Sequence, residues 1–145
     1  MTIALPDLAA MEVFGARIAA RLRIGDVVAL SGGLGAGKTT LARAIIRALG
    51  HEGEVPSPTF TIIETYDMLD PPVAHADFYR LERPEDAIEI GLDDYRAGAA
   101  LIAEWPEHAG GFAHEAGCLA IALETVRHGR IAIARRGANW LTRWP

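Results

Sequence analysis

The chain has 145 residues, half of them hydrophobic and 23% charged, which suits one folded domain and excludes a disordered chain. Its net charge is −5, whereas a protein that grips nucleic acid by itself normally carries a basic surface. No apolar run reaches the roughly 18 residues of a membrane span, and the single cysteine, Cys118, cannot form an internal disulfide. We therefore expect one cytoplasmic domain spanning residues 1–145, with no membrane segment and no disulfide.

The N-terminal part of the chain alternates helical and strand-like segments. Asp7 can cap an amphipathic helix over residues 8–22. Residues 26–31 form an apolar run that is too short for a helix and typical of a buried strand. After a glycine-rich loop, a helical pattern begins at residue 39, and Gly50 is expected to end it.

The rest of the chain is richer in strand patterns. Five strands are expected, at residues 59–66, 73–79, 99–105, 118–125 and 130–136. The last two flank a short turn and predict an antiparallel hairpin. A short helix is expected from Pro84 to Gly91, and residues 138–145 show no clear period. The pattern predicts an α/β sandwich with a mostly parallel mixed sheet and an antiparallel C-terminal hairpin.

The loop GGLGAGKTT, residues 32–40, satisfies the phosphate-loop pattern G-x-x-x-x-G-K-[ST]. Its Lys38 is the only lysine of the chain, although the chain has fourteen basic residues in all. A buried strand leads into the loop and a helix follows, so backbone N–H groups and the helix N-terminus can surround a phosphate. A compact ammonium fits such a site, whereas a guanidinium is wider and planar. The sequence therefore predicts a P-loop that binds nucleotide phosphates.

Two acidic residues follow predicted strands and are candidates for a magnesium site with Thr39. Mg²⁺ prefers oxygen ligands and commonly takes a carboxylate from a neighbouring strand end, where Asp77 and Glu104 are expected. Spacing does not decide which of them binds the metal and which orients water. If Glu104 faces the nucleotide, strand alternation places Trp105 on the opposite side. The hydroxyls of SPTFT, residues 57–61, fit either a turn or a sensor of the γ-phosphate.

Acidic residues gather between positions 82 and 94. They are Glu82, Glu85, Asp86, Glu89, Asp93 and Asp94. A solvated helix face and a docking patch for a basic partner are both compatible with this pattern.

Four segments together resemble the TsaE family, formerly called YjeE. LSGGLGAGKTT, SPTFTIIETY, HADFYRL and LIAEWPE occur in the order and spacing of that family, and the resemblance covers essentially the whole chain. It implies a P-loop ATPase required for threonylcarbamoylation of adenosine 37 in tRNAs that read ANN codons. It also implies two partner proteins, TsaB and TsaD. TsaD transfers the group, the ATPase acts on the TsaB–TsaD assembly, and tRNA is involved only indirectly.

The resemblance also implies roles for individual residues. ATP or ADP phosphates would bind at Gly33, Leu34, Gly35, Ala36, Gly37, Lys38, Thr39 and Thr40. Thr39 and Glu104 would hold Mg²⁺. The catalytic residues would be Asp77, Glu104, Thr59 and Thr61, and Pro6 and Arg130 would lie near the adenosine. The family usually has an acid at the second loop position, as in GDLGAGKTT. This chain has Gly33 there, so any role of that acid is absent.

Two other functions remain open. A small-molecule kinase uses the same loop, but it needs a second substrate pocket and commonly a lid. The segment between Gly50 and Thr59 is too short for a lid domain. A nucleotide-dependent binding module would bind ATP–Mg²⁺ without turning it over. We expect a weak, partner-dependent ATPase, because the chain offers a phosphate site without an obvious pocket for a second substrate.

Overall fold

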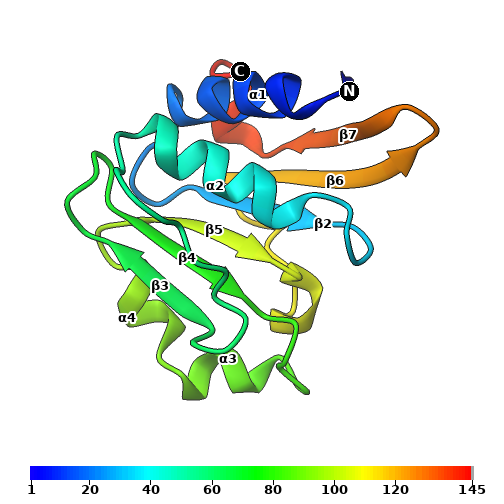
Figure 1. Ribbon diagram of the computed structural model, residues 1–145. Helices are drawn as coiled ribbons and strands as arrows, with labels where there is room; N and C mark the ends of the chain where they lie inside the picture. The colour runs from blue at the N-terminus through cyan, green and yellow to red at the C-terminus, as the bar shows by residue number, and fades with distance from the viewer. Residues whose placement is uncertain (145) are drawn as a thin grey trace.

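A seven-stranded mixed sheet forms the centre of the computed structural model, which describes residues 1–144. The strand order is β1-β7-β6-β2-β5-β4-β3 (Figure 1). The strands are β1 (Thr2–Leu5), β2 (Val27–Ser31), β3 (Ile63–Tyr66), β4 (Val73–Asp77), β5 (Ala100–Glu104), β6 (Cys118–Val126) and β7 (Gly129–Arg136). The central strands β4, β5, β2 and β6 run parallel, while β3, β7 and β1 are antiparallel to their neighbours. The predicted parallel centre and C-terminal hairpin are confirmed, and the opposite edge is antiparallel as well.

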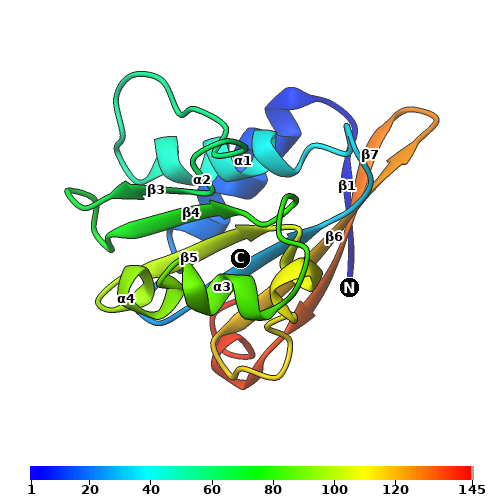
Figure 2. The same ribbon diagram turned by 90° about the horizontal axis from the view of Figure 1, so that it is seen from below.

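Helices cover both faces of this sheet (Figures 1 and 2). The longer helices, α1 (Leu8–Ala19) and α2 (Lys38–Ala48), pack against each other on one face. The short helices α3 (Glu85–Glu89) and α4 (Leu92–Arg96) lie on the other. A Cβ added at Gly15 would stand 2.5 Å from the Cβ of Ala44, so glycine permits the close approach of α1 and α2.

Each face of the sheet has its own hydrophobic core. Toward α1 and α2 the core includes Phe14, Ile18, Leu30, Leu41, Ile45 and Ile102. Toward α3 and α4 it includes Val27, Ala74, Phe78, Leu92, Leu101 and Phe112. Strands buried on both faces read as continuous apolar runs, which is why residues 26–31 and 99–105 were recognisable as central strands.

The C-terminal segment is tied down by a buried ion pair. After the 3₁₀ helix η2 (Ala138–Trp140), Arg143 donates two hydrogen bonds to the carboxylate of Asp26, at 2.7 and 2.8 Å. The indole N–H of the fully buried Trp140 donates to the carbonyl of Gly117 at 2.8 Å. The segment that showed no sequence period is therefore held by specific polar contacts.

Several expected boundaries were wrong for local reasons. Helix α1 ends at Ala19 rather than at residue 22, because the N–H groups of Arg21 and Leu22 donate to carbonyls three residues earlier instead of four. Strand β3 begins at Ile63 rather than at residue 59. The N–H of Ile62 donates to the carbonyl of Pro58 at 2.7 Å, and Ile62 has a φ of 68°, so residues 58–62 form a turn. Strand β4 ends at Asp77 rather than at residue 79.

Four elements were not anticipated. They are strand β1, helix α4 and the 3₁₀ helices η1 (Pro106–Ala109) and η2. Strand β1 gains its backbone partners from β7, more than a hundred residues away, so its four residues carry little local signal. None of the helices in residues 1–144 combines the length and apolar character that a membrane crossing requires.

The acidic residues around α3 and α4 differ in their contacts. Asp86 accepts hydrogen bonds from the backbone N–H groups of Glu82 and Arg83, both at 3.1 Å. The bond from the backbone N–H of Arg83 is the main cause of a lowered pKa of Asp86, and the bond from Glu82 adds to it. The other five acids are exposed.

Candidate nucleotide and magnesium site

The glycine-rich loop joins the C-terminal end of β2 to the N-terminus of α2. Strand β2 ends at Ser31, and α2 begins at Lys38, directly after Gly37 with its φ of 105°. Because β2, β5 and β4 are parallel, their C-terminal ends lie at the same edge of the sheet. The register pairs Leu30 with Glu104 and Glu104 with Asp77, which brings both carboxylates beside the loop.

A cleft of about 370 Å³ opens at this edge. Six of its lining residues come from the loop and the start of α2: Leu34, Gly35, Gly37, Lys38, Thr39 and Thr40. The others are Ser57, Thr59, Asp77, Tyr79, Glu104, Trp105 and Arg130. Most residues predicted from the motifs therefore meet at one cleft. Thr61 is exposed and does not line it.

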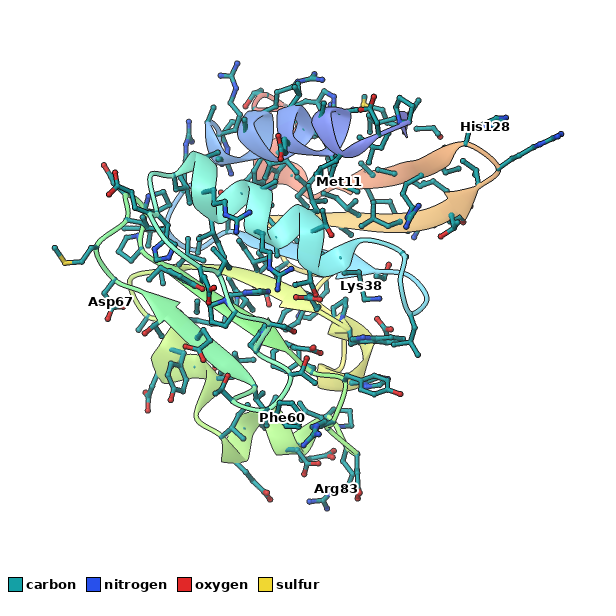
Figure 3. All side chains as sticks on the ribbon, viewed as in Figure 1. Met11, Lys38, Phe60, Asp67, Arg83 and His128 are labelled. Atoms are coloured by element: carbon teal, nitrogen blue, oxygen red, sulfur yellow. The ribbon has the colours of Figure 1, made fainter. Side chains whose placement is uncertain are left out.

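Lys38 lies where α2 leaves the loop (Figure 3) and is only 6% exposed. Its Nζ donates to the carbonyls of Gly32 and Gly33, both at 2.8 Å. The same nitrogen is 4.4 Å from the centre of the Trp105 ring. Burial lowers the pKa of Lys38, and the charges of Glu104 and Asp77 partly oppose that shift. The ammonium is thus enclosed by carbonyl oxygens and an aromatic ring.

Trp105 corrects one sequence expectation. Strand alternation predicted that its ring would point away from Glu104, but β5 ends at Glu104 and Trp105 has a φ of 54°. This left-handed conformation starts helix η1 and brings the ring into the cleft that Glu104 also lines. There it packs with the rings of Tyr79 and His108, at centroid distances of 5.0 and 5.3 Å.

Each oxygen of the Glu104 carboxylate has its own donor. The hydroxyl of Thr39 donates to Oε1 at 2.6 Å, and Nε2 of His75 lies 2.7 Å from Oε2. Glu104 is 2% exposed and His75 is fully buried. His75 was not among the residues predicted from the sequence. The available signal was its position two residues before Asp77, which places both side chains on the same face of β4.

Asp77 is held by a different set of contacts. Its Oδ1 accepts the backbone N–H of Tyr79 at 3.0 Å, and its Oδ2 accepts the Thr59 hydroxyl at 3.3 Å. The hydroxyls of Thr59 and Ser57 are 2.8 Å apart. The turn over residues 58–62 thus connects to Asp77, while Thr39 connects to Glu104.

Arg130 reaches the P-loop from the start of β7. Its Nε donates to the carbonyl of Ala36 and its terminal nitrogen Nη2 to that of Gly35, both at 3.1 Å. Pro6 does not line the main cleft. It lines an adjoining hollow of about 250 Å³ together with Arg130, Gly37 and Thr40.

The donor set fits Mg²⁺ bound together with a nucleotide. The hydroxyl of Thr39 and the carboxylate of Glu104 are hard oxygen donors in direct contact. Residues 1–144 contain no group of three or more His, Cys, Asp or Glu side chains that could hold a metal ion. Mg²⁺ is usually bound through one or two carboxylates together with substrate phosphates and waters.

Known proteins resemble this chain over most of its length. A family model described as threonylcarbamoyl adenosine biosynthesis protein TsaE matches residues 5–133. A protein of Haemophilus influenzae named tRNA threonylcarbamoyladenosine biosynthesis protein TsaE is 38% identical, over 82% of this chain and 79% of its own. The protein of the same name from Streptomyces coelicolor is 45% identical, over 67% of this chain and 68% of its own. The crystal structure of YdiB from Bacillus subtilis matches with a TM-score of 0.76 at 26% identity, over 99% of this chain and 88% of that one.

Proposed function

The chain belongs to the TsaE family, and we propose that it binds ATP with Mg²⁺ in this cleft, hydrolyses it to ADP, and thereby serves threonylcarbamoyladenosine biosynthesis in tRNA. The observation that carries the proposal is the contact between Thr39 and Glu104 at 2.6 Å, beside a P-loop whose lysine is enclosed. A P-loop threonine paired with a carboxylate at the end of a neighbouring strand is the arrangement that nucleotide hydrolases use for Mg²⁺.

The loop is proposed to bind the phosphates. Its backbone N–H groups and the N-terminus of α2 favour anions, and the Lys38 ammonium adds a full charge at the same place. Thr39 gives its hydrogen to Glu104, which leaves its lone pairs free to bind a cation. When bound, Mg²⁺ supplies positive charge that offsets the charge on the phosphate oxygens.

Asp77 is proposed to orient the attacking water, with Thr59 beside it. Both line the cleft, and the Thr59 hydroxyl already donates to the Asp77 carboxylate. We assign the metal to Glu104 rather than to Asp77 because Glu104 is the carboxylate that contacts Thr39. Thr61 is left out of the catalytic set because its side chain is exposed and outside the cleft.

The activity is proposed to depend on partners. The loop carries Gly33 at the position where the family resemblance implies an acid, so that acid is not available to position water. Catalysis of phosphoryl transfer is mostly positioning. We propose that the protein acts in the cytoplasm on an assembly of TsaB and TsaD, and that tRNA is reached only through that assembly. The net charge of −5 supports contact with protein rather than with tRNA.

Calorimetry and phosphate release test the proposal together. ADP and ATP binding are measured with and without Mg²⁺, and phosphate release is measured for the protein alone and with TsaB and TsaD from the same source. We expect Mg²⁺-dependent binding, slow release alone and faster release with the partners. Binding without release under every condition would identify a binding module instead. Transfer of labelled phosphate to a small-molecule acceptor would identify a kinase.

A further inference from the structure

His75 is a buried polar residue that the proposed ATPase mechanism does not use. It lies in the middle of β4 and is fully buried. Its Nε2 is 2.7 Å from Oε2 of Glu104, while its Nδ1 has no hydrogen-bond partner among the residues that the structure describes. An imidazole with one nitrogen left unsatisfied is a poor choice for filling a core, because an apolar side chain would avoid that penalty.

The register of the sheet explains the contact. His75 pairs with Ile102 and Asp77 pairs with Glu104 across the parallel strands β4 and β5. His75 and Glu104 therefore lie on the same face of the sheet, with His75 one side-chain repeat further from the P-loop edge. From this position the imidazole contacts the carboxylate oxygen that Thr39 leaves free.

We propose that His75 is a positioning residue for the magnesium site. A carboxylate accepts hydrogen bonds and does not donate them, so Nε2 carries the hydrogen and donates it to Oε2. That bond restricts rotation of the carboxylate and keeps Oε1 against the hydroxyl of Thr39, where the two oxygens are available to Mg²⁺. The inference rests on the proposed function, because it takes Glu104 and Thr39 to serve Mg²⁺.

Two amide substitutions of His75 distinguish a role in positioning Glu104 from a role in packing alone. In His75→Gln the amide nitrogen can occupy the place of Nε2 and donate to Glu104, whereas the shorter side chain of His75→Asn cannot reach it. We expect His75→Asn to weaken Mg²⁺ binding in the presence of ADP by about 10- to 100-fold, as is common when the hydrogen-bond partner of a metal ligand is lost. His75→Gln is expected to restore most of that affinity. The exposed His114 provides a control, His114→Asn, with no change expected.

The measurement is calorimetric titration of ADP at several Mg²⁺ concentrations and in EDTA. Affinity for ADP in EDTA is expected to be the same in wild type and both His75 variants, because the P-loop is untouched. In a Glu104→Gln background, His75→Asn is expected to have no further effect on Mg²⁺ affinity, because the carboxylate it positions is gone.

The outcomes separate this inference from the proposed function. Wild-type Mg²⁺ affinity in His75→Asn, with only a loss of thermal stability, would make His75 a packing residue and leave the ATPase proposal standing. ADP binding that is insensitive to Mg²⁺ in the wild type would overturn both. If His75→Asn does not fold, the wild-type ¹⁵N-histidine NMR spectrum decides. A protected Nε2–H signal that moves when Mg²⁺ joins ADP supports the inference, and one that stays unmoved refutes it.

Discussion

Replacing Lys38 by arginine is expected to abolish tight nucleotide binding almost as completely as replacing it by alanine. A hydrogen bond to a charged group contributes about 1.5–3 kcal/mol, and an ammonium between two phosphates makes two of them. Loss of both, about 3–6 kcal/mol, corresponds to a rise in Kd of roughly 10²- to 10⁴-fold. We expect Lys38→Ala to fall in this range.

The arginine variant tests whether size or charge is limiting. The Nζ of Lys38 sits 2.8 Å from two loop carbonyls and 4.4 Å from the Trp105 ring centre, and the residue is 6% exposed. A planar guanidinium has to push the ring aside or leave the loop. Calorimetry with ADP–Mg²⁺ measures the effect, with circular dichroism as the control for folding. An arginine variant that binds ADP within a few-fold of wild type would refute the size argument.

The lowered pKa of Lys38 predicts opposite pH trends for nucleotide affinity and for the stability of the nucleotide-free protein. Burial lowers its pKa from the ordinary value of 10.5. Phosphates need the charged ammonium, so nucleotide affinity is expected to fall as pH rises through the folded-state pKa. Between that pKa and 10.5 the unfolded chain binds more protons, so the nucleotide-free protein is expected to gain stability from this group with rising pH. Calorimetry and urea denaturation across alkaline pH measure the two trends, and the contribution of this group to the stability trend should vanish in Lys38→Ala.

Four further substitutions test other parts of the structure. Glu104→Gln is expected to leave ADP binding in EDTA intact but to slow partner-stimulated phosphate release by roughly 10²-fold, and release within a few-fold of wild type would point to the other carboxylate as the metal ligand. Arg143→Leu leaves Asp26 buried without its partner and should lower the free energy of unfolding in urea by about 3–5 kcal/mol, with partial recovery when Asp26→Asn is added. Trp105→Phe should remove the change in tryptophan emission on nucleotide binding, because its ring lies against the lysine, and a change that persists would assign it to another tryptophan. Gly33→Asp should change the free energy of unfolding by no more than about 0.5 kcal/mol, since an added Cβ meets nothing within 4 Å. The same variant should release phosphate faster in the presence of the partners. An unchanged rate would show that the loop acid is dispensable.

The sequence motif and the hydrophobic periodicity were sufficient to predict the P-loop and the central strands. The strand, glycines, lysine and helix of the loop are contiguous, so their geometry follows from local backbone preferences and from residues that are neighbours in the chain. The strands in runs 26–31 and 99–105 are buried on both faces, so their continuous apolar composition was enough to predict them. Turn chemistry was harder to recognise. The β-branched and aromatic residues at 59–62 suggested a strand, but the Pro58–Ile62 hydrogen bond closes a turn instead.

By itself the sequence determined the phosphate loop, the α/β class and the two candidate carboxylates, because each depends on residues adjacent in the chain or on a short repeat. Tertiary structure alone decided how those carboxylates are used. Glu104 meets Thr39 across 65 residues and His75 across 29, and Arg130 meets the loop carbonyls across 95. Such contacts depend on strand order and register, which are set by the packing of whole elements, and no local pattern encodes them. The left-handed backbone of Trp105 was likewise not encoded by a local pattern, since it depends on β5 ending and η1 starting at this point.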